Sequence, residues 1–332
     1  MSARAWAAFA AVSTLWGMPY LFIKVAVEDG MPPAFLAWAR VLLGAVVLLA
    51  LAWRAGKLGP LRGRWGWIAL FAVIEIAIPF PLIAAGEQEV SSSLAAILIA
   101  AAPLFVALLA IRFDEEERAT GWRLAGLVIG LGGVVALVGI DVAGKPGELL
   151  GSAAILVAAL GYAAGPMILK RKLAGIDSRA TMGATLLVAT VVLTPAAAIA
   201  PPESAPSGDA VVAVVVLGLF CTAAALVLWG VLVAEAGPGR ALVITYVAPV
   251  VAVTLGVAIL EESLGPGAIA GLLLILAGSW LSTDGRVPPG LGALAARANG
   301  VRRFVTPGRT WEMAGRTRFS SRTSSGSPPS PS

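Results

Sequence analysis

Long apolar stretches alternate with short polar segments over most of this 332-residue chain. A helix needs roughly 20 apolar residues to cross the hydrocarbon core of a bilayer. Backbone groups in that core must bond within their own segment, so such stretches are predicted to be helices. The pattern therefore predicts an all-α integral membrane protein with ten transmembrane helices. The predicted helices are 5–27, 34–53, 65–86, 91–112, 122–140, 148–169, 180–200, 210–234, 240–260 and 266–283.

The first apolar stretch shares one feature with a signal peptide. Arg4 precedes it, but the stretch is long and runs to Lys24 without a convincing cleavage site. We therefore expect it to be retained as the first transmembrane helix.

Lysine and arginine are unevenly distributed among the polar segments. Segments 54–64, 112–123 and 170–179 each hold at least three basic residues, whereas 28–33 and 87–90 hold none. Cytoplasmic loops of membrane proteins carry such an excess. Both termini are therefore predicted to lie in the cytoplasm, with the chain in a cell (inner) membrane. The predicted external segments carry acids: Glu28, Asp29, Glu87, Glu89, Glu203 and Asp209.

Composition supports a membrane protein and argues against several other classes. The chain is 58% hydrophobic and 13% charged, with a mean hydropathy of +0.90, whereas soluble domains carry about 25% charged residues. The net charge of +5 does not indicate nucleic-acid binding, because the basic residues lie in short loops and near the C-terminus. Histidine is absent, so the commonest metal ligand and acid–base group is missing. We expect neither an enzyme nor a bound metal or cofactor.

The C-terminal residues 285–332 differ in kind from the rest of the chain. They hold eight arginines and end in a run rich in serine and proline. They lack the apolar content needed to fold alone. The segment is predicted to be a basic, disordered cytoplasmic tail, with contact to anionic lipid or to a partner as the alternative.

The chain contains an internal repeat at an offset of 145 to 146 residues. In the first half Pro103 is followed by Glu117 and then by Gly126, and the second half has the same three residue types in the same order. Their counterparts are Pro249, Glu262 and Gly271. The repeats are predicted to cover residues 5–142 and 147–284.

Five helices per repeat is an odd number, so the second repeat must enter the membrane with the opposite orientation. Inverted repeats are typical of secondary transporters, because exchanging the conformations of the two halves moves the opening from one membrane face to the other. The alternative is a duplicated scaffold or receptor that transports nothing. A lipid-modifying membrane enzyme is a third class, but the sequence shows no acid–base cluster for it.

Several segments together resemble the EamA family of the drug/metabolite transporter superfamily. They include LWGMPYLFIKVAV (15–27), the surroundings of Arg40, SSSLAAILIAAAPLFVALLA (91–110) and YVAPVVAVTLGVAILEESLGPGAIAGLLLILAG (246–278). The resemblance implies a ten-helix inverted-repeat transporter that moves amino acids, other metabolites or drugs. The acidic run DEEER (114–118) departs from the usual single glutamate of the family.

Glu75 is the most informative single residue, because it lies at the middle of a predicted span. An ionised acid at that depth costs about 2.5–3.5 kcal/mol on insertion scales. Pro79, four residues later, lacks the N–H that would bond the carbonyl of Glu75. We expect Glu75 to line the substrate path, where it binds a cationic group or carries a proton. The alternative is a protonated acid bonded to a neighbouring helix.

Other residues within the spans complete the candidate site. Aromatic residues inside spans offer flat apolar surfaces to a substrate, and prolines are expected to break helices near the midplane. Lys24 and Arg40 are close enough to the outer surface to reach it and are candidates for a gate or vestibule. The aromatic candidates are Trp16, Tyr20, Tyr162, Trp229 and Tyr246, and the further helix-break candidates are Pro19, Pro103, Pro166 and Pro249.

The glycine motifs are interpreted as packing faces. GLVIG (126–130), GYAAG (161–165) and GAIAG (267–271) have the spacing that lets membrane helices approach closely. We expect them to lie away from the substrate. The predicted function is secondary transport of a small metabolite, in the direction of export, with proton coupling and homo-oligomerisation left open.

Overall fold

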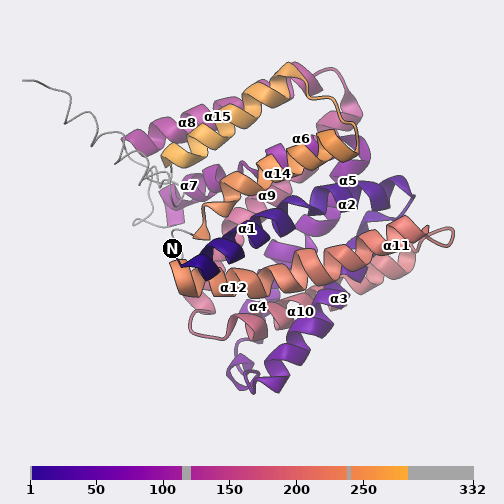
Figure 1. Ribbon diagram of the computed structural model, residues 1–332, viewed down its shortest axis with the longest axis vertical. Helices are drawn as coiled ribbons and strands as arrows, with labels where there is room; N and C mark the ends of the chain where they lie inside the picture. Colours follow the sequence, from indigo (N-terminus) through magenta and orange to yellow (C-terminus); the bar gives the residue numbers. More distant parts are fainter. Residues whose placement is uncertain (1, 114–120, 238–240, 283–332) are drawn as a thin grey trace, which may run out of the picture. The chain divides into compact units, whose positions relative to one another are not determined.

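The structure, a computed structural model, describes residues 2–113, 121–237 and 241–282 (Figure 1). Within these residues the chain is helical and forms no strand. Eight helical segments of 21–29 residues are long and apolar enough to cross a membrane. The protein is therefore a multi-pass membrane protein. The last two predicted spans form shorter apolar helices, Ile244–Ile259 and Pro266–Ser282.

The first half consists of five helical segments, three of which are interrupted within the predicted span. Pro19 and Pro79 are the first residues of their helices, since proline fits the N-terminal turn of a helix but not its interior. The helices are α1 (Ala3–Gly17), α2 (Pro19–Glu28), α3 (Pro33–Arg54), the short η1 (Gly59–Leu61), α4 (Trp65–Ala72), η2 (Val73–Ala77), α5 (Pro79–Glu89), α6 (Ser92–Ile99), α7 (Ala102–Phe113), α8 (Trp122–Leu137) and η4 (Val138–Val142).

The second half repeats this arrangement with fewer interruptions. Pro166 and Pro249 lie inside uninterrupted helices, which corrects the expectation that both break their spans. A membrane helix tolerates the loss of one backbone hydrogen bond when its neighbours support it. The helices are α9 (Pro146–Lys172), α10 (Ser178–Ile199), α11 (Gly208–Val215), η5 (Val216–Ala224), α12 (Ala225–Ala236), α14 (Ile244–Ile259) and α15 (Pro266–Ser282).

Helices α8 and α15, the last of each half, lie side by side (Figure 1). A side chain at Gly126 would collide with the backbone of Ser282 and Gly278. One at Gly133 would collide with Leu274 and lie in tight contact with the backbone of Gly271. The two helices therefore run antiparallel with their backbones close together, as glycines permit. Gly126 corresponds to Gly271 in the repeat, and Gly133 corresponds to Gly278. Exchanging the halves thus converts one contact into the other.

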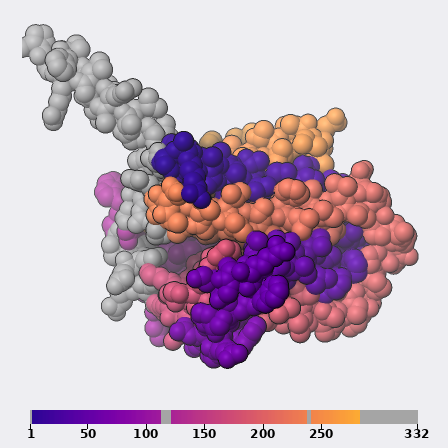
Figure 2. Space-filling view, turned by 60° about the horizontal axis from the view of Figure 1, so that its bottom comes forward, coloured from indigo at the N-terminus to yellow at the C-terminus, as the bar shows by residue number. Residues whose placement is uncertain are grey.

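Helices α3 and α10 show the same exchange. The indole N–H of Trp38 donates to the hydroxyl of Thr194 (3.1 Å), and Gly183 faces the backbone of Leu49. At the repeat offset of 145 residues, Trp38 corresponds to Gly183 and Leu49 to Thr194. A two-fold relation between the halves produces such reciprocal contacts. Figure 2 shows another meeting of distant segments, where indigo N-terminal residues lie beside orange residues of the second half.

The ends of the two halves are joined by carboxylates that accept backbone hydrogen bonds. Glu262 accepts from the N–H groups of Ser92 (2.7 Å) and Ser93 (3.0 Å) at the start of α6. Asp141 accepts from the N–H groups of Gly267 (3.0 Å) and Ala268 (2.5 Å) at the start of α15. Each carboxylate satisfies donors that a helix N-terminus leaves unpaired. In both cases the acid belongs to one half and the helix to the other.

Some sequence predictions lie outside the described residues. They concern Glu117 and the acidic run around it, and the C-terminal segment 285–332.

Candidate functional site

Glu75 lies on η2, a π-helical turn between α4 and α5. The turn is closed by a hydrogen bond from the N–H of Ile78 to the carbonyl of Val73, five residues back (3.0 Å). Pro79 follows at once and contributes no N–H. Isolated π-helical turns inside α-helices occur frequently at functional sites.

Helix α9 packs its glycines against this turn. A side chain at Gly165 would collide with the carboxyl group of Glu75, and one at Gly161 would collide with the carbonyl of Ile74 and the ring of Pro79. The GYAAG segment was expected to pack away from the substrate path, but it packs directly against the main acidic candidate. Oε2 of Glu75 is buried and has no hydrogen-bond partner among the described residues.

Arg40 lies in the interior of the protein, on α3. Only 9% of its surface is exposed, its Nε donates to the hydroxyl of Thr222 (2.9 Å), and its guanidinium lies 4.2 Å from the centre of the Phe80 ring. A cation over an aromatic face is stabilised by the ring quadrupole. The structure thus corrects the expectation that Arg40 reaches the outer surface, since the side chain turns toward the second half instead.

Two tyrosines accompany Arg40. Tyr20 on α2 and Tyr162 on α9 pack against the same apolar cluster. Tyr162 also packs against the cluster that contains Phe80, the ring that Arg40 contacts. Tyr162 lies on α9 between Gly161 and Gly165, the two glycines that pack against the turn carrying Glu75. Glu75, Tyr20, Tyr162 and Arg40 are thus gathered from both halves into one neighbourhood, which we call the central cluster. No ion pair between Arg40 and a carboxylate occurs among the described residues.

Lys24 lies beside the central cluster and is only partly buried. Its ammonium group donates to the backbone carbonyls of Glu87 (2.8 Å) and Val90 (3.1 Å) and lies 3.4 Å from the carboxylate of Glu28. Asp29, the acid next to Glu28, does not pair with Lys24 and accepts instead from the N–H of Ser207 (3.0 Å).

Glu87 was predicted to be an acid of an external loop, and this prediction is wrong. Helix α5 continues to Glu89, and Glu87 is fully buried with neither carboxyl oxygen hydrogen-bonded to any described residue. It lies within electrostatic range of Arg40. An acid with an unsatisfied carboxyl group in a protein interior is a candidate functional residue.

The other aromatic candidates form a separate group. The rings of Trp16 and Trp229 are 5.3 Å apart, and both pack with Tyr246 in another apolar cluster. The hydroxyl of Tyr246 donates to the backbone carbonyl of Ser279 (3.2 Å). These three residues are therefore engaged with one another and with α15.

Sequence reasoning missed Phe80, Thr222 and Glu87 as members of this region. Thr222 stands out only as a hydroxyl in a long apolar run, and Phe80 carries no signal that separates it from a core residue. Among the described residues, no group of histidine, cysteine, aspartate and glutamate could hold a metal ion.

Several known proteins that are similar to this chain are named as membrane transporters. A model of the EamA-like transporter family matches residues 4–139 and 149–283. The uncharacterized inner membrane transporter YedA of Escherichia coli K12 is 33% identical over 260 residues, which cover 76% of this chain and 82% of YedA. A probable amino-acid metabolite efflux pump of the same organism is 25% identical over 284 residues, which cover 82% of this chain and 93% of the pump. A solved structure named only as a crystal structure of protein shares the fold, with a TM-score of 0.62 and 20% identity over 86% of this chain.

Proposed function

The chain belongs to the EamA-like transporter family, and from this premise we propose that it is a secondary transporter of a small metabolite that works by alternating access. The observation that carries this proposal is the reciprocal contact between the halves, described above for α8 with α15 and for α3 with α10. A pair of halves related by a two-fold axis has two equivalent arrangements, one open to each side of the membrane.

The proposed arrangement in the membrane is ten spans in two inverted repeats, with both termini cytoplasmic. The two shorter helices, α14 and α15, have 16 and 17 residues. At 1.5 Å per residue they reach about 25 Å, close to the thickness of the hydrocarbon core. The basic segments 54–64 and 170–179 then face the cytoplasm, and the membrane is the cell (inner) membrane.

The central cluster is proposed as the substrate site. Its residues come from both halves, so a change in the angle between the halves alters the distances within it. Arg40 presents a buried guanidinium to an anionic group of the substrate, while Tyr20 and Tyr162 present ring surfaces and hydroxyls. Glu75 binds a cationic group or carries a proton.

The proposed substrate is an amino acid or a related metabolite, and the proposed direction is export. Both follow from the relative named as an amino-acid metabolite efflux pump and agree with a site that contains one buried cation and buried acids. A drug is the other substrate class that the family resemblance implies.

Counterflow in liposomes tests the proposal. The reconstituted protein is assayed with labelled amino acids and cationic drugs, as wild type and as Glu75→Gln and Arg40→Gln. We expect flux of at least one compound by the wild type, and at least a tenfold loss in either variant, which is the effect of about 1.4 kcal/mol. Lys145→Gln is the control, because Lys145 pairs with Glu148 at the start of α9 (3.0 Å) and lies outside the cluster.

The alternative function is a non-transporting scaffold or receptor. It predicts no flux of any compound and no effect of the cluster variants. If flux is unchanged in both variants, the protein is still a transporter, but the central cluster is not its substrate site. A loss of flux only at altered pH in Glu75→Gln would support proton coupling through Glu75.

A further inference from the structure

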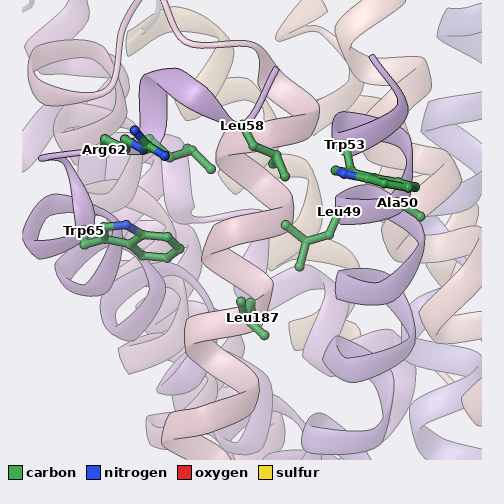
Figure 3. A pocket seen from close by; sticks show the side chains of 8 residues that line it. Leu49, Ala50, Trp53, Leu58, Arg62, Trp65 and Leu187 are labelled. Carbon is green, nitrogen blue, oxygen red and sulfur yellow. The ribbon is translucent and has the colours of Figure 1, made fainter. Parts of the chain in front are cut away.

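A surface hollow lies at the end of the α3–α4 hairpin and is lined by none of the residues of the central cluster (Figure 3). Its volume is about 590 Å³, and it is open along the protein surface. Figure 3 shows Arg62 and Trp65 on one side, Trp53 and Ala50 on the other, and leucines between them. The lining residues are Leu49, Ala50, Trp53, Leu58, Leu61, Arg62, Trp65 and Leu187.

The local sequence explains why a hollow forms at this place. Gly56 and Gly63 adopt positive φ angles of 65° and 79°, which let the loop fold back toward α3. The loop then places Leu61 in an apolar cluster, where it is 4% exposed. Its neighbour Arg62 is left on the rim of the hollow. Ala50, a small residue beside Trp53, leaves that wall of the hollow open (Figure 3).

The hollow reaches from the membrane interface into the hydrocarbon layer. Trp53 and Trp65 lie at the ends of spans and are 72% and 46% exposed, as in the aromatic belts of membrane proteins. Leu187 lies nine residues inside α10, which begins at Ser178. At a rise of 1.5 Å per residue, this corresponds to a depth of about 13 Å.

The rim of the hollow carries an excess of positive charge. The loop 54–64 holds four basic residues and no acid. Arg64 donates to the backbone carbonyl of Lys172, whereas Arg54, Lys57 and Arg62 form no hydrogen bond or ion pair with the described residues. All three side chains are exposed to solvent.

The nearest acid along α10 does not offset this charge. Asp177, at the start of the helix that packs on α3, is held by Arg179 through two hydrogen bonds of 3.1 and 2.9 Å. The pair is neutral as a whole. The rim therefore offers free cationic groups directly above an apolar hollow.

We propose that this hollow binds one anionic phospholipid, with an acyl chain between Trp53 and Trp65 and the phosphate group at Arg62. The acyl chain alone gives no selectivity, because bulk lipid is as apolar as the leucines of the hollow. Selectivity for an anionic head group comes from Arg62, with Arg54 and Lys57 beside it, since anionic lipid attracts basic residues near the membrane surface. The hollow fixes where the chain of that lipid lies.

Native mass spectrometry of the purified full-length protein tests this. The protein is titrated with dioleoyl phosphatidylglycerol, or with dioleoyl phosphatidylcholine, which has the same chains and no net charge. We expect the anionic lipid to be retained more strongly. We expect Arg62→Gln to weaken its retention about fivefold, the effect of one basic residue near the surface. Lys145→Gln removes one charge elsewhere and is expected to leave retention unchanged.

A second variant separates the hollow from general charge attraction. Ala50→Phe adds a ring to the wall of the hollow beside Trp53 and leaves every charge in place, including the arginines of residues 285–332. Ala50 is exposed, so the larger side chain does not disturb the core. We expect this variant to lose the retained lipid. In a separate measurement, we expect brominated phosphatidylglycerol to quench the tryptophan fluorescence of the wild type more than that of Trp53→Phe. Equal retention in Arg62→Gln, Ala50→Phe and wild type, or equal retention of the two lipids, would overturn the proposal.

Discussion

Replacing Gly278 with alanine is expected to destabilise the protein, because the added methyl group enters the crossing of α8 and α15. A Cβ atom at Gly278 falls against the backbone nitrogen and Cα of Gly130 and against the carbonyl oxygen of Gly126. These are backbone atoms, so no side chain can rotate away and the helices must move apart. Overpacking of this kind costs about 1–3 kcal/mol.

Gly132→Ala is the matched control for this substitution. Gly132 lies on α8, but a Cβ at this position meets no atom within 4 Å. Both substitutions replace a helical glycine and gain about 1 kcal/mol in helix propensity. The difference between the two variants therefore isolates the clash, and we expect it to be about 2 kcal/mol.

Cys221 provides the assay, because it is the only cysteine in the chain and is 1% exposed. A thiol-reactive dye will label it only when the protein unfolds, so heating the detergent-solubilised protein with the dye gives an unfolding temperature. At roughly 2–4 °C per kcal/mol, the two variants should differ by about 4–8 °C. Equal unfolding temperatures for Gly278→Ala and Gly132→Ala would refute the close packing of α8 against α15.

Two further substitutions test contacts at helix ends. Glu262→Ala should lower the free energy of unfolding by about 1–2 kcal/mol, because Glu262 accepts hydrogen bonds from the N–H groups of Ser92 and Ser93. Glu262→Gln should lower it less, because the amide oxygen can still accept. Equal losses in the two variants would contradict this reasoning. The pKa of Asp177 lies below its usual range, chiefly because of the hydrogen bond from the side chain of Arg179. This pair therefore stabilises the protein above the unfolded pKa of about 4, and its contribution is lost as pH falls through the lower folded pKa. Between pH 6 and pH 3 the unfolding temperature of the wild type should fall further than that of Asp177→Asn. If the unfolding temperatures of both proteins fall equally, the pair does not contribute to stability.

The helical segments were predictable from the sequence because an apolar stretch in hydrocarbon must satisfy its backbone groups internally. The repeat was equally visible, since Gly126 and Gly271 recur at the same offset and the structure brings both into the α8–α15 crossing. The position of Glu75 within its span was also readable, and the structure adds the π-helical turn that carries it.

The direction in which a side chain points was not predictable in the same way. Arg40 was placed by its depth along a span, but depth does not tell which face of the helix it occupies, and the guanidinium turns toward Thr222 of the other half. Glu87 follows the apolar stretch and was therefore interpreted as a loop residue. In the structure Lys24, 63 residues away in sequence, donates to the backbone carbonyl of Glu87. Such contacts between distant segments leave no periodic signal.

The carboxylate of Glu262 at the start of α6 has a consequence for how the chain is made. The residues it joins are 170 positions apart, so a ribosome adding about 5–20 residues per second needs roughly 10–30 s to supply the acid after α6 has emerged. During that time the backbone N–H groups at the start of α6 lack this acceptor, and α8 has no α15 to pack against. The first half is thus synthesised before these partners exist, and its contacts with Glu262 and α15 can form only after the second half has been made.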